Sequence, residues 1–148
     1  MWIYDSGMVK TYRINVQTRG NCHVVNITDD VASAVEDSGC ADGAVVLFNV
    51  GSTAGITTLE YEPGLAKHDI AALFERLAPA NARYEHEETW HDDNGHSHCR
   101  AALLGPSLNV PIVDGKMTLG TWQQIVLIDF DTRARTRTIV CQIMGAGN

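Results

Sequence analysis

Strand-like segments fill the carboxyl-terminal third of the chain, and they constrain its fold more than any other feature. Residues 108–113, 117–130 and 135–144 are rich in Val, Ile, Leu and Thr, with short turns at Asp114-Gly115 and Asp131-Thr132. Turns this short join antiparallel neighbours. The pattern therefore predicts a β-meander in this part of the chain.

The amino-terminal half predicts a hairpin followed by helices. Residues 9–18 and 22–27 alternate loosely on either side of Arg19-Gly20-Asn21, which predicts two paired antiparallel strands. Apolar residues at helical spacing predict one helix over 28–38, ended by Gly39, and another over 65–77, ended by Pro79.

Three short segments complete the expected elements. Residues 44–48 are all apolar, which predicts a strand buried on both faces, and a second strand is expected over 56–61. Residues 98–104 precede Gly105-Pro106, which predicts a two-turn helix with a glycine terminator. Because no long linker divides the 148 residues, we expect one domain over 1–148.

Charge and hydropathy exclude some classes of function. The net charge is −7 and the chain has no Lys/Arg block, so nucleic acid is not an expected partner. No run of eighteen apolar residues and no leader pattern occur, so we expect a soluble cytoplasmic protein without a membrane partner. The four cysteines are widely spaced and form no Cys-x-x-Cys pair, so we expect reduced thiols.

A histidine cluster is the strongest chemical signal in the sequence. His86, His91, His96 and His98 are interleaved with five carboxylates, and imidazole is the commonest metal ligand in proteins. His86, His96 and His98 would offer three imidazoles and an open position, as in catalytic zinc sites. His96 and His98 share a side only if the segment is extended, because in a helix they diverge. The alternative is a polar surface loop with solvated histidines.

Two other segments have the composition of anion sites. Small residues over 51–55 leave backbone N–H groups accessible, so Ser52 and Thr53 could help to hold a phosphate, although a tight turn explains them equally well. Arg133, Arg135 and Arg137 share one face of the last expected strand. We interpret them as structural, because Asp129 and Asp131 can pair with them across the strands.

Several motifs occur together in an order typical of one family. They are GSTAGITTLEYEPG, HDIAALFERLAP, YEHE, DDNGHSH, LLGPSLNVPIVDGKMTLGTWQ and RARTRTIVCQIMG, and they cover roughly residues 43–145. On these motifs the chain resembles the YjbQ-like family, often labelled secondary thiamine-phosphate synthases. The resemblance implies an α+β fold, with sandwich-like antiparallel sheets and two to three short helices, assembled as a homotrimer.

The resemblance also implies a weak activity that joins a hydroxymethylpyrimidine diphosphate to a thiazole phosphate. It carries over Glu60, His86, residues 94–98 and Thr121-Trp122-Gln123 as site residues, and among them we expect Glu60 and His96 to be catalytic. From the histidine cluster we expect His86, His96 and His98 to bind a divalent metal, zinc or magnesium. The phosphorylated substrates would contact residues of three segments, namely Ser52, Thr53, Asn94, Gly95, Ser97, Thr121, Trp122 and Gln123.

One departure from the family motif leaves two functions open. Many members carry His-Thr-Thr or His-Thr-Ser where this chain has Gly51-Ser52-Thr53, so one imidazole is missing. Magnesium prefers oxygen ligands, whereas the histidines favour zinc, so they would alternatively donate hydrogen bonds to phosphate. The chain is then either a transferase or a non-catalytic trimer that binds a metal or a phosphorylated metabolite.

Overall fold

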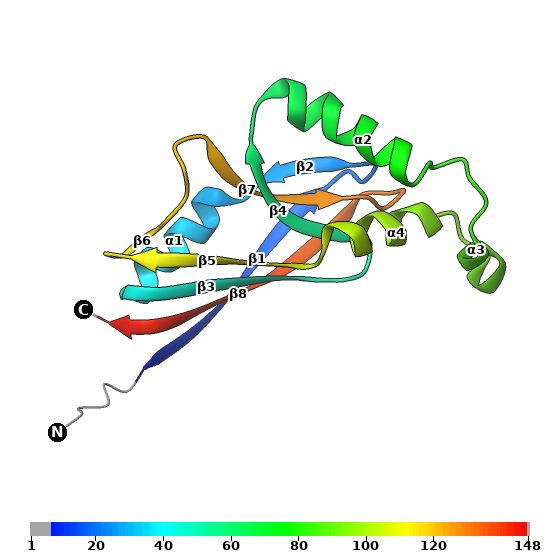
Figure 1. Ribbon diagram of the computed structural model, residues 1–148. Coiled ribbons are helices and arrows are strands. Elements are labelled where there is room, and N and C mark those ends of the chain that lie inside the picture. The colour runs from blue at the N-terminus through cyan, green and yellow to red at the C-terminus, as the bar shows by residue number, and fades with distance from the viewer. Residues whose placement is uncertain (1–6, 148) are drawn as a thin grey trace.

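Two antiparallel sheets form the centre of the computed structural model, which describes residues 7–147 (Figure 1). The five-stranded sheet has the order β1 (Met8–Thr18), β8 (Arg135–Gly147), β3 (Cys40–Val50), β5 (Ser107–Val113) and β6 (Lys116–Met117). The three-stranded sheet has the order β2 (His23–Asn26), β7 (Gln123–Asp129) and β4 (Ala54–Glu60). The expected α+β fold with antiparallel sheets is confirmed.

Helices cover the small sheet on the side away from the large one (Figure 1). The π-helical turn η1 (Leu65–Asp69) continues directly into α2 (Ile70–Leu77), and α4 (Gly95–Leu104) packs on β4. Helix α1 (Thr28–Ser38) packs at the other end, against β6 and β8. With the short α3 (Glu85–Trp90), residues 7–147 contain four α-helices, one more than the sequence predicts.

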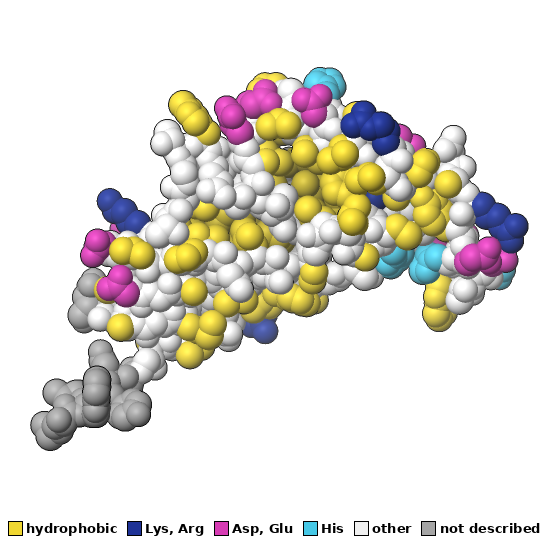
Figure 2. Space-filling view, viewed as in Figure 1, with side chains coloured by type: hydrophobic (Ala, Val, Ile, Leu, Met, Phe, Trp, Pro, Cys, Tyr) yellow, Lys and Arg dark blue, Asp and Glu magenta, His cyan; other side chains and the backbone are white. Residues whose placement is uncertain are grey.

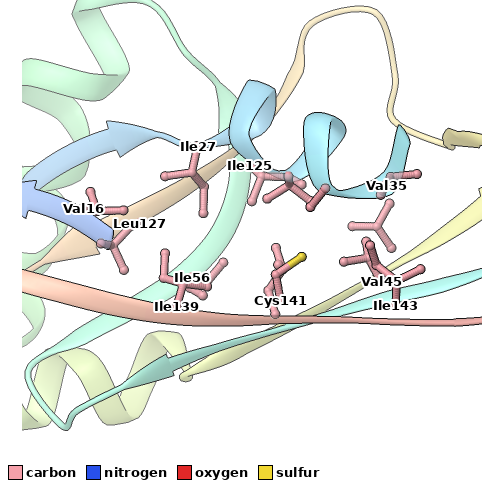
Figure 3. Close-up of a cluster of buried hydrophobic side chains, with 14 of the residues drawn as sticks. Val16, Ile27, Val35, Val45, Ile56, Ile125, Leu127, Ile139, Cys141 and Ile143 are labelled. Carbon is pink, nitrogen blue, oxygen red and sulfur yellow. The ribbon is translucent and has the colours of Figure 1, made fainter. Parts of the chain in front are cut away.

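Strand β7 contributes to two cores because its side chains alternate between faces. Ile125 and Leu127 point toward the large sheet, where they pack with Ile139 and other fully buried residues (Figure 3). Phe130, just beyond β7, packs with Val126 and Ile128 in a second cluster beneath the helices, with its ring centroid 4.6 Å from that of Phe74. The small sheet is therefore the middle of three layers.

The predicted amino-terminal hairpin is wrong. Strand β1 pairs with β8 along its whole length, from Met8–Gly145 to Thr18–Arg135, while β2 pairs with β7 in the other sheet. Three consecutive residues between them, Gly20, Asn21 and Cys22, have positive φ. A Cβ on Gly20 would lie 2.5 Å from the Asp131 carbonyl oxygen. This turn thus packs against the loop after β7 and directs the chain from one sheet to the other.

The predicted β-meander is right for its first hairpin and wrong beyond it. The turn at Asp114-Gly115 joins β5 and β6 as antiparallel neighbours. The expected strand over 117–130 divides, since β6 ends at Met117 in the large sheet and β7 begins at Gln123 in the small one. Likewise β7 and β8 follow each other in the chain but belong to different sheets. A strand with apolar residues on both faces suits a middle layer, and it pairs with β2 and β4 rather than with its sequence neighbours.

The strand over 44–48 is buried on one face only. Val45 and Leu47 are fully buried, whereas Phe48 keeps 46% of its surface exposed. Other apolar residues share the outer face of the large sheet by the pairing register: Val9, Val50, Val113 and Met144, all exposed. Burial on both faces would need a partner that covers this surface.

Two helices agree with the sequence prediction in their bounds. Helix α1 covers 28–38, and Gly39 ends it in the left-handed region with φ of 68°. Residues 65–77 are helical as expected, with the first turn in π geometry. Helix α4 begins at Gly95, three residues before the predicted start, and α3 was not predicted.

Cys22, Cys40 and Cys141 are buried, Cys99 is exposed, and all four are free thiols as expected. Within residues 7–147, none of the helices has the length and apolar character needed to span a bilayer.

Candidate functional site

The histidine-rich segment folds into two short helices joined by a tight connection. His91 ends α3 in the left-handed conformation with φ of 57°, and its N–H donates to the Glu87 carbonyl at 2.7 Å. The Asn94 carbonyl then accepts the N–H groups of Ser97 and His98 at 2.9 and 3.2 Å, which begins α4. His91 therefore terminates a helix, and the connection brings α3 back toward α4.

Glycine is required where the two helices meet. A Cβ on Gly95 would lie 2.5 Å from the Tyr84 Cβ, far inside van der Waals contact. The phenol of Tyr84 donates to the Pro79 carbonyl at 2.8 Å, which holds the ring in place. The close contact between Gly95 and Tyr84 thus sets the distance between His86 of α3 and the histidines of α4.

His86 and His98 lie side by side in this arrangement. Their ring centroids are 4.4 Å apart, and His86 Nε2 lies 3.3 Å from Asp92 Oδ1. With its amide nitrogen turned inward, Asn94 lies 3.3 Å from His86 Nε2 and 3.1 Å from Asp92 Oδ1. His86 can donate to Asp92 when Nε2 carries the proton, or accept from Asn94 when it does not. Figure 2 shows histidine side chains gathered where α3 and α4 meet.

The surroundings of His98 favour its neutral form. Burial lowers the pKa of His98, and the adjacent His86 lowers it further. Asp92, Asp131 and a hydrogen bond with the backbone of Ser52 act in the opposite direction without cancelling the shift. At neutral pH the ring therefore carries one N–H group, which the backbone of Ser52 engages, and offers the lone pair of its other nitrogen to a ligand.

A pocket of about 400 Å³ opens beside His98. Its walls are formed by small and apolar residues of three segments: Phe48, Gly51, Ser52, Ala54, Ala101, Ala102 and Pro106. Among residues 7–147, His98 is the only ionisable residue that lines it. The pocket can accept an apolar or aromatic group whose polar end meets His98 and Ser52.

His96 lies apart from His86 and His98. Its side chain is 5% exposed and lines a different pocket with Glu75 and Arg100. Its ring centroid is 6.2 Å from that of Tyr84, and its Nδ1 makes no hydrogen bond within the described residues. Burial lowers the pKa of His96, as does the nearby Arg100. The helical form of residues 95–104 makes His96 and His98 diverge, which is one of the two geometries that the sequence left open.

The arrangement has consequences for a metal. No group of three or more His, Cys, Asp or Glu side chains among residues 7–147 is placed to hold a metal ion. The side chains of His86, His98 and Asp92 carry donor atoms of the kind that zinc binds. These atoms are not, however, grouped around one position where an ion could lie. Joint ligation by His86, His96 and His98 stays a prediction, and in this conformation His96 faces elsewhere.

A buried ion network supports the floor of the His98 pocket. The Thr53 hydroxyl accepts from Arg137 Nη2 at 2.7 Å and donates to Asp131 Oδ2 at 3.0 Å. Arg137 and Arg135 pair with Asp129 and Asp131, as the sequence predicts. Arg133 lies instead 3.9 Å from Asp93 in the loop before α4. The network fixes the buried side chain of Thr53, while the neighbouring Ser52 is exposed and lines the pocket.

Ser97, in the first turn of α4, is fully buried. Its hydroxyl donates to the Phe130 carbonyl at 2.5 Å, so it anchors the helix to the end of β7. Residues Asn94 and Gly95 shape the connection that carries His98. Sequence reasoning missed the roles of Asp92 and Tyr84, although their positions beside His86 and the DDNG turn are a usable signal.

The remaining predicted site residues lie at the far end of the small sheet. Glu60 ends β4 and pairs with Gln123, the first residue of β7. Gln123 donates to Thr58 Oγ1 at 2.9 Å and accepts the Gly120 N–H at 3.1 Å, while Trp122 is 72% exposed. Ala54, at the His98 pocket, is six residues before Glu60, which corresponds to about 20 Å along a strand.

Comparison with known proteins identifies the family. The model of the family described as UPF0047 protein YjbQ-like matches residues 12–146. The chain belongs to this family. The UPF0047 protein of Archaeoglobus fulgidus is 35% identical over 127 residues, which are 86% of this chain and 96% of the relative. The UPF0047 protein YugU of Bacillus subtilis is 32% identical over 139 residues, 93% of this chain and all of that protein.

Solved structures of the family share the fold. A YbjQ-like protein of unknown function from Sulfolobus solfataricus superposes with a TM-score of 0.83 at 33% identity, covering 93% of this chain and 99% of that one. A hypothetical protein from Aeropyrum pernix superposes with a TM-score of 0.85 at 29% identity, covering 92% and 98%. In both cases the likeness extends over more than nine tenths of each chain.

Proposed function

We propose that the protein is a thiamine-phosphate synthase-type transferase, which binds a phosphorylated small molecule at the pocket beside His98. The main support for this proposal is that the neutral, partly buried imidazole of His98 lies at the mouth of a pocket walled by small residues. A flat heterocycle would occupy the apolar part. Its phosphate groups would meet Ser52, His98 and His86 at the rim.

The proposed reaction joins two phosphorylated heterocycles. The bond between the pyrimidine methylene carbon and the diphosphate oxygen breaks as the thiazole nitrogen bonds to that carbon, which releases diphosphate. Charge accumulates on the leaving oxygen, so preorganised donors placed there lower the barrier. The Ser52 hydroxyl and a ring N–H group of His86 are the donors that this chain supplies, while neutral His98 presents the lone pair of its free ring nitrogen.

A divalent ion would add Lewis-acid assistance to the departing diphosphate. His86, His98 and Asp92 are the residues that would hold it, and two imidazoles favour zinc over magnesium. These side chains do not form a ready-made ligand set in this conformation.

The separation of the predicted site residues within one chain supports a homotrimer in which a second subunit would complete the site. Glu60 and the segment Thr121–Gln123 are about 20 Å along β4 from the His98 pocket of the same chain. The pocket borders the outer face of the large sheet through Phe48, and that face carries exposed apolar side chains. A second copy covering this face would bury these side chains and bring its own residues to the pocket.

The test is direct assay of the transfer. Purified protein given hydroxymethylpyrimidine diphosphate and thiazole phosphate should form thiamine phosphate, detected by mass spectrometry. His98→Ala should abolish the product, whereas His68→Ala, an exposed histidine on η1, should leave the rate unchanged. Absence of turnover in the parent protein, with no rescue of a strain that lacks its main synthase, would reject the transferase.

A non-catalytic binding trimer is the second candidate. Gly51 stands where many family members have histidine, and its φ is 139°. A Cβ added there would lie 3.2 Å from Arg137 Nη1, so both the backbone and the space disfavour a side chain. Elemental analysis and native mass of the parent, His98→Ala and His96→Ala proteins separate the two candidates. Metal loss together with trimer dissociation favours the binding protein, and an intact trimer with weaker ligand binding favours the enzyme.

A further inference from the structure

A second groove lies on the other side of α4 from the His98 pocket. It consists of two adjoining pockets, of about 670 and 370 Å³, which share Asn21, Cys22 and Ala71. It runs between the turn before β2 and helix α2. His96 lines this groove and His98 lines the other pocket, because residues two apart on a helix point in nearly opposite directions.

The larger pocket is positively charged in a protein whose net charge is −7. Arg19 and Lys67 line it, no Asp or Glu does, and neither cation forms an ion pair within residues 7–147. His23 lines it as well, and its Nδ1 accepts the Arg19 backbone N–H at 3.1 Å. A neutral His23 must therefore carry its proton on Nε2, which makes it a third donor.

The smaller pocket ends at a buried polar group that lacks a partner. His96 is 5% exposed, and its Nδ1 makes no hydrogen bond to any described residue. Beside it, Arg100 is already engaged by Glu75 at 2.6 Å and by the Ala78 carbonyl at 2.9 Å. Buried polar atoms in folded proteins nearly always have partners. Nδ1 itself is covered by protein atoms, so a ligand in the groove meets the exposed edge of the His96 ring and reaches Nδ1 only if the ring turns.

We propose that this groove is a second binding site, which takes a small phosphorylated metabolite. The phosphate lies against Arg19, Lys67 and His23, and a hydroxyl-bearing body extends past Cys22 toward His96. Two unpaired cations and a ring N–H match a dianion, and charge-assisted hydrogen bonds supply most of the affinity. The proposal does not depend on chemistry at the His98 pocket, because it uses none of the residues that line that pocket; it assigns His96 to ligand binding in place of the catalytic role that the resemblance implies.

The probes are inorganic phosphate and ribose 5-phosphate, with binding followed by calorimetry and by backbone amide NMR shifts. Both should shift the amides of residues 19–24. Arg19→Gln/Lys67→Gln should weaken both probes about tenfold or more. Lys10→Gln/Arg13→Gln is the matched control, since it removes the same charge from two exposed residues of β1 and should change neither affinity.

Variants of His96 test the other end of the groove. His96→Phe should weaken ribose 5-phosphate while leaving inorganic phosphate unchanged, and His96→Gln, which keeps a polar side chain, should restore part of the loss. Equal affinities in the two charge variants would overturn the proposal. So would probe shifts confined to Ser52 and residues 95–98 that disappear in His98→Ala, because they would place all binding at the other pocket. An unchanged ribose 5-phosphate affinity in His96→Phe would exclude contact with His96.

Discussion

Arg137 on β8 and Asp129 at the end of β7 form a two-pronged ion pair that joins the two sheets. The Nε–Oδ2 and Nη2–Oδ1 distances are 2.6 and 2.7 Å, and both side chains are buried. The Thr18 hydroxyl donates to the same carboxylate at 2.5 Å. Strands β1, β7 and β8 thus meet at one carboxylate directly beneath the 51–53 turn.

Breaking this pair should destabilise the protein strongly. Arg137→Met leaves the Asp129 carboxylate buried without its cation, so we expect a loss of about 3–5 kcal/mol in the free energy of unfolding. Urea denaturation measures it. The double variant Arg137→Met/Asp129→Leu should recover a large part of the loss, while Arg133→Met, at an exposed ion pair, should cost under about 1 kcal/mol. Similar losses for Arg137→Met and Arg133→Met would contradict the assignment.

Asp131 should make stability depend on pH in the acid range. Burial by itself would raise the pKa of Asp131, but hydrogen bonds from Arg135, the Thr132 N–H and Thr53 outweigh it and lower the pKa. A depressed pKa stabilises the fold above the unfolded value near 3.8, and this contribution is lost as pH falls through the folded pKa. The free energy of unfolding, measured with urea between pH 6 and pH 2.5, should therefore fall less steeply with decreasing pH in Asp131→Asn than in the parent protein. Asp69→Asn, at an exposed position, should follow the parent curve.

The contact between Gly95 and Tyr84 should limit substitutions in the connection. Gly95→Ala places a methyl group 2.5 Å from Tyr84 Cβ, so α3 must move away from α4 and the distance between His86 and His98 must increase. We expect a lower thermal midpoint together with altered ring signals of both histidines in NMR spectra. Gly120→Ala, where the Cβ would make ordinary contacts at 3.7 Å, is the matched control for stability. Unchanged histidine signals in Gly95→Ala would show that this contact does not set their spacing.

Zinc and diphosphate should respond oppositely to pH at the histidine site. Zinc needs neutral rings, so its affinity should fall as pH drops below about 6.5, whereas added ring protons should strengthen diphosphate binding over the same range. Because burial lowers the pKa of His98, its part in zinc binding should persist below that value. Calorimetry at pH 5.5 and 7.5 separates the two. Zinc binding that survives in His86→Ala/His96→Ala/His98→Ala would exclude a metal at the cluster.

Assembly should depend on the outer face of the large sheet. Phe48→Glu adds a charge among exposed apolar side chains without disturbing the core. If a second copy covers this face, light scattering should show a trimer for the parent protein and smaller species for the variant. Lys10→Glu, an exposed residue elsewhere on β1, tests for a general charge effect. A parent protein that remains monomeric at micromolar concentration would reject the trimer.

Local patterns in the sequence determined two of the helical segments and most of the strand segments, but not α3 or the division of residues 117–130 between two sheets. Apolar spacing and a glycine stop define α1 over 28–38, since a helix depends on residues three and four apart. Charge and alternation also predicted the partners of Arg135 and Arg137, although the pair of Arg137 with Asp129 joins two sheets rather than neighbouring strands of a hairpin. In the site, the His-rich segment and the 51–55 turn were recognised from composition, and the family from the order of motifs.

Only the tertiary structure decided which strands pair and which histidines meet. Strand β1 pairs with β8 at a sequence separation that no local pattern encodes. Strand β7 belongs to the small sheet, the middle layer, where both of its apolar faces are buried. Helix α4 begins after Asn94, so His96 and His98 point into different pockets. His86 lies next to His98 because the chain reverses at His91, which is left-handed, and because Gly95 allows close contact with Tyr84. Pairing and spacing of this kind depend on packing between distant segments, which short-range preferences do not determine.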